Sequence, residues 1–294
     1  MSLLSDRIKK NGPELHALAT GGLPYFVTAR RPFPLQEAIP VFCYHLVEKQ
    51  SFEADLLFLE QNGYHTTTAD DLLDWINGKK ALAKNSIVLT FDDGADNFYR
   101  VAYPLLQQYQ QTAVLFVAPG LHRVASEEPW HANRPCTWEE LTEMHQSGLV
   151  DLQSHTWEHR SLQTWPTPLP LTGVSHEHLE GRRAVPRNMY DDLLLARKTL
   201  EEHFHKPIQH LAWPCYYSKN HTIDIAVQAG YTAFWTGTLP HLPIITPGHD
   251  PHKIVRISGE FVRRLPGVGR ESLYKILRTR YKNSYAKLLS GKVK

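Results

Sequence analysis

Short apolar runs alternate with longer amphipathic segments along most of this chain, after a proline-rich stretch at 31–34. The short runs have the length of buried strands, and the longer ones carry apolar residues at helical spacing. A repeated strand–helix order is typical of a parallel sheet. The pattern predicts strands at Val41–His45, Ser86–Phe91, Ala113–Ala118, Val150–Ser154, Ile208–Trp213, Tyr231–Trp235 and Lys253–Ile257.

The segments between these strands are predicted to be helices, and some carry end signals. Thr137 precedes a helix with Glu140 three residues later, the sequence of a capping box. Gly148 and Gly230 stand where helices end and a left-handed residue is favoured. The predicted helices lie near Phe52–Asn62, Asp70–Asn77, Asp96–Gln110, Trp138–Ser147, Met189–His205 and Thr222–Gly230.

About seven strand–helix units predict an α/β fold with parallel strands. We expect a distorted (β/α) barrel, with an open doubly wound sheet as the alternative, and both place function at the carboxyl ends of the strands. We expect an N-terminal extension at 1–35, a main domain at 36–262 and a basic, helical C-terminal tail at 263–294. A proline-rich segment at 163–187 is predicted to be an inserted loop of the kind that often covers a site.

Composition narrows the class of protein. Of 294 residues, 42% are hydrophobic and 21% are charged, which excludes a disordered chain. The net charge of +2 gives no reason to expect nucleic acid as a partner. Cys43, Cys136 and Cys215 form no metal-binding CxxC motif, so we expect reduced thiols. No signal-peptide core or membrane-length apolar run is present, so we expect a cytoplasmic chain without a transmembrane segment, or a periplasmic or exported one if a leader has been removed.

Two adjacent carboxylates, Asp92 and Asp93, directly follow the predicted strand 86–91. Like charges side by side repel, so a shared cation or proton is the usual reason for keeping both. One of them could instead cap the helix expected near Ala95. Capping accounts for one carboxylate and not for two.

Two histidines, His155 and His159, directly follow the predicted strand 150–154. Their spacing lets both imidazoles reach one ion from a helical turn. The chain has 17 histidines, so such a pair can arise by chance, and Glu158 between them could be a solvated charge. The ends of parallel strands meet, however, so with Asp93 the pair predicts a two-His, one-carboxylate metal site with positions open for water and substrate.

Two other strand ends carry candidate residues. Trp213, Pro214, Cys215 and Tyr216 close one strand with an aromatic rim suited to a sugar ring, although Trp213 is equally suited to core packing. His45 closes another strand, where a histidine can protonate a leaving group near neutral pH. Without further context, a structural role for His45 is the alternative.

These residues together resemble the polysaccharide deacetylases, the NodB-homology group also called carbohydrate esterase family 4. The intact TFDDG motif at 90–94 and the HxxxH motif at 155–159 carry the resemblance, which covers roughly 41–257. It implies that Asp93, His155 and His159 hold one divalent metal ion, usually zinc, with Co²⁺, Ni²⁺, Mn²⁺ or Fe²⁺ as alternatives. It also implies that Asp92 is the general base.

Segments at 52–64, 102–106 and 138–148 are also similar to a permuted subgroup of that family, which includes biofilm poly-N-acetylglucosamine deacetylases. In that subgroup the general acid is a histidine on a strand before the Asp motif. The similarity therefore implies that His45 is the acid, with His249 as the competing candidate.

The family's third motif, Arg-x-Pro-Tyr, is altered here to Ala212-Trp213-Pro214-Cys215. The arginine that would orient the base is therefore missing. From its position on the last strand, Arg256 could approach Asp92 in its place. The resemblance further implies that the backbone N–H of Cys215 serves as the oxyanion donor.

The predicted function is a metal-dependent hydrolase that removes N-acetyl (or O-acetyl) groups from a sugar or polysaccharide. One alternative is another C–N amide hydrolase on the same scaffold, such as a deformylase or a cyclic-imide hydrolase. A second is a non-haem Fe(II) oxygenase, which the strand–helix alternation disfavours because those enzymes usually have all-β scaffolds. A third is a carbohydrate-binding protein that has lost turnover, which the altered third motif keeps open.

Overall fold

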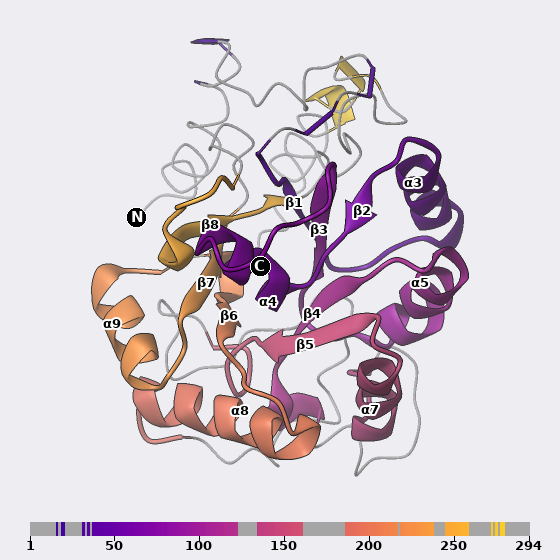
Figure 1. The fold of residues 1–294 in the computed structure, drawn as a ribbon. Coiled ribbons are helices and arrows are strands. Elements are labelled where there is room, and N and C mark those ends of the chain that lie inside the picture. Colours follow the sequence, from indigo (N-terminus) through magenta and orange to yellow (C-terminus); the bar gives the residue numbers. More distant parts are fainter. Residues whose placement is uncertain are drawn as a thin grey trace.

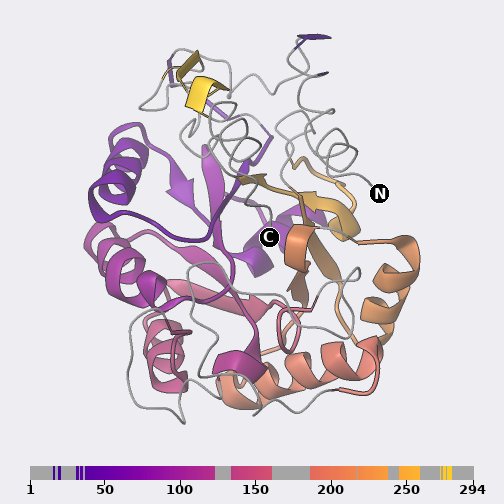
Figure 2. The same cartoon turned by 180° about the vertical axis from the view of Figure 1, so that it is seen from behind.

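A ring of parallel strands surrounded by helices forms the centre of the molecule (Figures 1 and 2). This computed structural model describes residues 37–122, 134–160, 186–216, 218–237 and 245–258, together with a few positions within 16–35 and 272–279. The strands are β1 (Val41–Tyr44), β2 (His65–Thr66), β3 (Ser86–Phe91), β4 (Ala113–Val117), β5 (Val150–Ser154), β6 (His210–Ala212), β7 (Ala233–Thr236), β8 (Ile254–Val255) and β9 (Ile257–Ser258).

The sheet closes into a barrel through its last two strands. The strand order is β8-β7-β6-β5-β4-β3-β1-β9, and every pair in this described sheet is parallel. Only Arg256 separates β8, which pairs with β7, from β9, which pairs with β1. The two short strands therefore act as one interrupted strand that joins both edges. The result is a nearly closed barrel of seven parallel strands, which confirms the predicted barrel.

Alternate residues of the strands face two separate hydrophobic clusters, as the two-residue period of a strand requires. Val88 and Val114 face the barrel interior, whereas their neighbours Leu89 and Leu115 face the helices outside. The outer helices are α3 (Lys49–Gln61), α5 (Tyr103–Tyr109), α7 (Trp138–Gln146), α8 (Met189–Phe204) and α9 (Asn220–Gln228).

Helix α4 (Ala69–Ile76) has a different place, because its apolar face packs with the interior cluster. Figure 1 shows it near the middle of the ring. The C=O of Ile76, at its end, accepts from the N–H of Gly248 in the segment before β8, 2.9 Å away. Helix α4 therefore fills the end of the barrel where the strands begin. The other end, where the strands finish, carries the polar residues described below.

The predicted elements match the structure most closely where their end signals are strongest. β3 and β5 have the predicted bounds, Thr137 and Glu140 form the predicted capping box, and Gly148 and Gly230 have φ values of 72° and 95°. The two-residue strand β2 was not predicted, because two residues carry no periodicity. The helix predicted near 96–110 begins with a π-helical turn, η1 (Phe98–Ala102), before α5.

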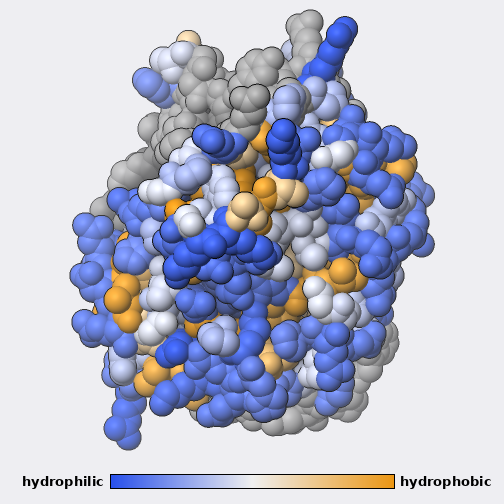
Figure 3. Space-filling view, viewed as in Figure 1, coloured by the Kyte–Doolittle hydropathy of each residue, from blue (hydrophilic) through white to orange (hydrophobic). Residues whose placement is uncertain are grey.

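Several predictions lie largely outside the described residues: the extension at 1–35, the inserted loop at 163–187 and the basic tail at 263–294. The division into domains therefore stays a prediction. None of the described helices is long and apolar enough to cross a bilayer. On the face in Figure 3, hydrophilic residues cover most of the described surface and hydrophobic residues appear in small separate groups.

Candidate metal centre and catalytic site

The loops after β3 and β5 bring Asp93, His155 and His159 together. Oδ1 of Asp93 lies 3.4 Å from Nε2 of His155 and 3.4 Å from Nε2 of His159. Their three potential ligand atoms all lie within 4.8 Å of one another, and all three residues are buried. Two imidazole nitrogens and one carboxylate oxygen are a donor set typical of a catalytic divalent metal. The three predicted ligands thus form one group that could hold an ion.

The electrostatics of this group favour positive charge. Burial alone would raise the pKa of Asp93, but hydrogen bonding with His155 and the nearby charge of His159 hold it well below its usual range. Burial lowers the pKa of His155, yet Asp92 and Asp93 outweigh that effect and raise it above the ordinary value. A proton on His155 is therefore stabilised where a metal ion would lie.

The backbone geometry that joins the two histidines differs from the prediction. Thr156 and His159 have φ values of 67° and 55°, in the left-handed region that a right-handed helical turn does not contain. The two rings meet, with centroids 4.8 Å apart, because a bent loop folds back on itself. The prediction of a helical turn was therefore wrong, although the pairing of the histidines is present.

A second hydrogen bond fixes the orientation of His155. Its Nδ1 lies 2.8 Å from the backbone oxygen of Ala212 at the end of β6. A carbonyl oxygen only accepts, so in the neutral ring Nδ1 carries the proton and Nε2 has the lone pair that an ion would bind. This is the tautomer that a metal ligand needs. Ala212, which stands where the family motif has arginine, thus orients His155 through its backbone oxygen.

Gly94 in the TFDDG motif has both a conformational and a steric requirement for glycine. Its φ is 61°, and a Cβ built on it would lie 2.4 Å from Cε1 of His122. His122 is fully buried, and burial lowers its pKa to about 4. This histidine therefore packs against Gly94, the residue that follows the acidic pair. Nothing in the sequence around His122 indicated that position.

Gly94→Ala is expected to destabilise the fold and disturb metal binding, because the new methyl group would push His122 and the neighbouring Asp93 apart. The strained φ adds about 1 kcal/mol or more. Gly148→Ala is the matched control, since that glycine has a similar φ of 72° with open space around it. Thermal unfolding and metal content measure the difference. If both variants lost the same thermal stability and metal content, the strained φ alone would account for the effect, and the contact with His122 would play no part.

The other carboxylate, Asp92, forms a buried two-pronged ion pair with Arg256. Nη1 and Nη2 of Arg256 lie 2.6 Å and 2.9 Å from the two carboxylate oxygens. Burial alone would raise the pKa of Asp92, but the Arg256 guanidinium lowers it more, with help from His155. The carboxylate is therefore held in its charged form. Arg256, which lies between β8 and β9, thus makes the contact with Asp92 that was expected of the arginine missing from the third motif.

The thiol of Cys43 also lies at Asp92, with Sγ 3.5 Å from Oδ2. Burial raises the pKa of this thiol far above its ordinary value, so it remains a donor to the carboxylate. Sequence reasoning identified Cys43 only as a reduced cysteine. Its place follows from the pairing of β1 with β3, which puts Cys43 beside Thr90.

Replacing Arg256 with Gln is expected to raise the pKa of Asp92, because burial then acts without its main opposing charge. The acid limb of the kcat/KM–pH profile should move to higher pH, and the folded state should lose about 3–5 kcal/mol from the unpaired buried charge. In the wild type, stability from the lowered pKa is present above about pH 4 and is lost at lower pH, so the difference between the proteins should shrink there.

Arg100→Gln is the control for that substitution. Arg100 pairs with Asp96 at 2.9 Å and not with Asp92, so its loss should leave the pH profile unchanged. An unshifted acid limb in Arg256→Gln would contradict the assigned link between Arg256 and Asp92.

His45 directly follows β1 and lies at the same end of the barrel. Its Nε2 is 3.1 Å from the hydroxyl of Tyr216, and its charge contributes to lowering the pKa of both Asp92 and Asp93. The competing candidate, His249, precedes β8 and contacts the backbone oxygen of Lys253 at 2.9 Å. That segment lies at the opposite end of the barrel, where the strands begin. The structure therefore does not bring His249 to the site.

The predicted substrate residues follow β6 in a short 3₁₀ helix, Pro214–Tyr216. Cys215 and Tyr216 have φ values of 58° and 62°, so this turn is held in a strained backbone form of the kind often found at functional sites. The Cys215 side chain is exposed. Trp213 is 3% exposed and packs against Phe234, so core packing describes its side chain as it stands. The roles of these residues toward substrate stay predictions.

Sequence reasoning missed a group of buried ionisable side chains packed against residues 155–160, the loop that carries His155 and His159 and is here called the metal loop. Glu158, which could have been a solvated charge, is 1% exposed and pairs with Arg160. Asp192 in the first turn of α8 faces them, and burial raises its pKa to about 7 against the opposing effects of the Trp157 N–H and Arg160. No periodicity links residues 158 and 192, so only the fold reveals this group.

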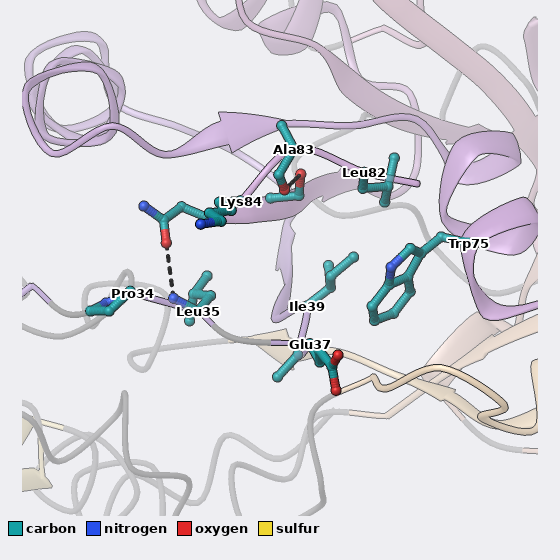
Figure 4. Close-up of a pocket in the computed structure, with 11 residues that line it drawn as sticks. Pro34, Leu35, Glu37, Ile39, Trp75, Leu82, Ala83 and Lys84 are labelled. Atoms are coloured by element: carbon teal, nitrogen blue, oxygen red, sulfur yellow. Dashed lines mark hydrogen bonds between the residues drawn. The ribbon is translucent and has the colours of Figure 1, made fainter. Parts of the chain in front are cut away.

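A cavity of about 770 Å³ lies at the opposite end of the barrel (Figure 4). Ile39 before β1, Trp75 near the end of α4 and Leu82 before β3 line it, together with Glu37 and Lys84. None of the metal-ligand candidates is among its lining residues. The candidate site residues therefore lie at the carboxyl ends of the strands, away from this cavity.

Comparisons with known proteins point to one family. The family model described as polysaccharide deacetylase matches residues 79–234. Bacillus subtilis YxkH is 25% identical over 201 residues, which are 66% of this chain and 62% of that protein. The poly-beta-1,6-N-acetyl-D-glucosamine N-deacetylase of Escherichia coli is 30% identical over 118 residues, 38% of this chain and 18% of that enzyme. The chain thus matches less than two thirds of the length of each of these two relatives.

The fold has solved counterparts as well. The structure of IcaB from Ammonifex degensii superposes with a TM-score of 0.61 at 24% identity, covering 76% of this chain and 92% of that one. The family model spans more than half of this chain and includes both the acidic pair and the HxxxH motif. The chain therefore belongs to the polysaccharide deacetylase family.

Proposed function

We propose that this protein is a metal-dependent hydrolase that removes N-acetyl (or O-acetyl) groups from a sugar or polysaccharide. The observation that carries the proposal is the division of the acidic pair. Asp93 faces two histidines, whereas Asp92 is held by Arg256. A three-ligand metal group beside a separate, charged carboxylate is the arrangement that metal-assisted hydrolysis requires.

Zinc is the ion we propose for the group formed by Asp93, His155 and His159, because two imidazoles and a carboxylate suit it. When bound, such an ion polarises a carbonyl oxygen and lowers the pKa of water.

The residues of the chain supply the remaining steps. Asp92, kept deprotonated by Arg256, accepts the proton from the water that attacks the acetyl carbonyl. The backbone N–H of Cys215 would donate to the developing oxyanion. His45 then protonates the leaving amine, and its contact with the Tyr216 hydroxyl restricts the orientation of its ring. The bond between the carbonyl carbon and the sugar nitrogen breaks, releasing acetate.

The altered third motif left open the alternative that this is a carbohydrate-binding protein that has lost turnover. The Arg256 ion pair supports catalysis over binding, because it keeps Asp92 charged beside the metal-ligand candidates, where a general base would be needed.

A panel of substrates tests the proposed reaction with the purified, zinc-loaded protein. N-acetylglucosamine oligomers and O-acetylated xylan oligomers are compared with an N-formyl peptide and a cyclic imide. We expect acetate release from the acetylated sugars. Formate release or ring opening without acetate would replace the proposal by the corresponding amide hydrolase.

A further inference from the structure

The loop that carries His155 and His159 is contacted on its inner side by three buried ionisable side chains, Glu158, Arg160 and Asp192, here called the anchoring cluster. Their exposed fractions are 1%, 3% and 1%. Nη2 of Arg160 donates to Glu158, and Nε of Arg160 faces Oδ2 of Asp192 at 3.5 Å. Two of these charges belong to the loop, whereas Asp192 comes from helix α8.

Asp192 contacts the loop on both sides of the metal-ligand candidate His159. Its Oδ1 accepts from the N–H of Trp157 at 3.0 Å, and its Oδ2 faces Arg160. A further bond, from the N–H of Arg160 to Oγ1 of Thr156 at 2.9 Å, closes the bend. His159 therefore lies within a turn whose two ends meet on one carboxylate.

The turn needs such support because its backbone is strained. Thr156 and His159 both have left-handed φ values, and each residue of this kind costs about 1–2 kcal/mol. Two neighbouring elements also fix the same segment. The N–H of Gly120 donates to the C=O of Trp157 at 2.9 Å, and the hydroxyl of Tyr231 donates to Ser154 at 2.8 Å. Neither of these two contacts joins both sides of His159, whereas Asp192 contacts Trp157 before it and Arg160 after it.

We propose that Asp192 is a positioning residue for the metal centre, which holds the Trp157–Arg160 turn so that Nε2 of His159 faces Asp93. This rests on the metal centre of the proposed function but not on the identity of the substrate. Outer-shell partners of metal ligands typically change metal affinity by about 10- to 100-fold. A buried ion pair kept only for stability would not alter metal affinity selectively.

Asp192→Ala is the direct test, and Asp151→Ala is its matched control. Asp151 is also a buried carboxylate, lies at the other end of β5, accepts from the N–H of Ala69 at 2.9 Å and pairs with Lys206. Both variants therefore remove a carboxylate that accepts from a backbone N–H and lies beside a cation, and Asp151 also accepts from Nε2 of Gln153 at 2.9 Å. Only the first of these carboxylates contacts the metal loop.

The measurements are zinc affinity by competition with a chromogenic chelator, the visible absorption spectrum of the Co²⁺ form, and thermal unfolding without metal. We expect Asp192→Ala to bind zinc about 10- to 100-fold more weakly, with an altered Co²⁺ spectrum. Asp151→Ala should lose thermal stability but keep wild-type affinity and spectrum. Asp192→Asn should be intermediate, because its amide oxygen can still accept from Trp157 while its NH₂ group opposes Arg160.

Wild-type zinc affinity in Asp192→Ala would overturn the proposal, as would an equal fall in both alanine variants. Should Asp192→Ala not fold, unchanged affinity in Asp192→Asn would overturn it instead. Failure of the wild-type protein to bind zinc would contradict the proposed metal centre itself, which distinguishes that outcome from failure of the positioning role alone.

Discussion

Asp92→Asn is expected to bind metal at the wild-type level and to lose turnover by about 10²- to 10⁴-fold, the usual contribution of a general base. Asp92 lies outside the ligand group, so the ion should be retained. An amide cannot accept the proton from water, and Arg256 keeps its place through the remaining carbonyl oxygen. Metal content and the initial rate of acetate release, measured on the same preparation, check both parts.

The control for this substitution is Asp96→Asn, four residues further along the same loop. Asp96 is buried, but it pairs with the exposed Arg100 and is not part of the metal group, so its loss should leave turnover near the wild-type rate. If Asp92→Asn loses its metal, or keeps its activity, the assigned roles of the two adjacent carboxylates are wrong.

His159→Ala is expected to lose both metal and activity. Two ligand candidates, Asp93 and His155, would remain, and a two-ligand site holds zinc poorly because structural and catalytic sites use three or four. We expect zinc affinity to fall by more than the roughly 100-fold that an outer-shell partner costs. Metal content after dialysis and chelator competition measure this loss.

His203→Ala provides the comparison, since this histidine contacts Thr142 at 3.0 Å on the outer surface between α7 and α8. It should keep the wild-type metal content. A His159→Ala protein that still carries one zinc ion per chain would show that the ion is held elsewhere.

The sequence predicted the ligand group because strand ends are a strong signal. The Asp92–Asp93 pair and His155 each directly follow a predicted strand, and parallel strands must finish at one end of the barrel. The same rule placed His45 correctly at that end. His249 stayed a competing candidate in the sequence analysis, and the structure places it at the other end because it precedes its strand instead of following it.

Residues that act through long-range packing were much harder to predict. Arg256 was a candidate only by position, and its contact with Asp92 depends on the closing of the barrel between β8 and β9. His122 and Asp192 reach the site from behind, across contacts that carry no sequence periodicity. The bent form of the HxxxH loop was missed because left-handed φ values at Thr156 and His159 are not the preference of those residue types.

The most direct test of the proposed function is chelator-sensitive acetate release from N-acetylglucosamine oligomers. The account predicts that the wild-type protein releases acetate, that a chelator stops the release, and that added zinc restores it. In Asp92→Asn, zinc should bind again without restoring the rate. Acetate release that persists after the metal has been removed, or no release from any acetylated sugar by the fully metal-loaded protein, would contradict the account.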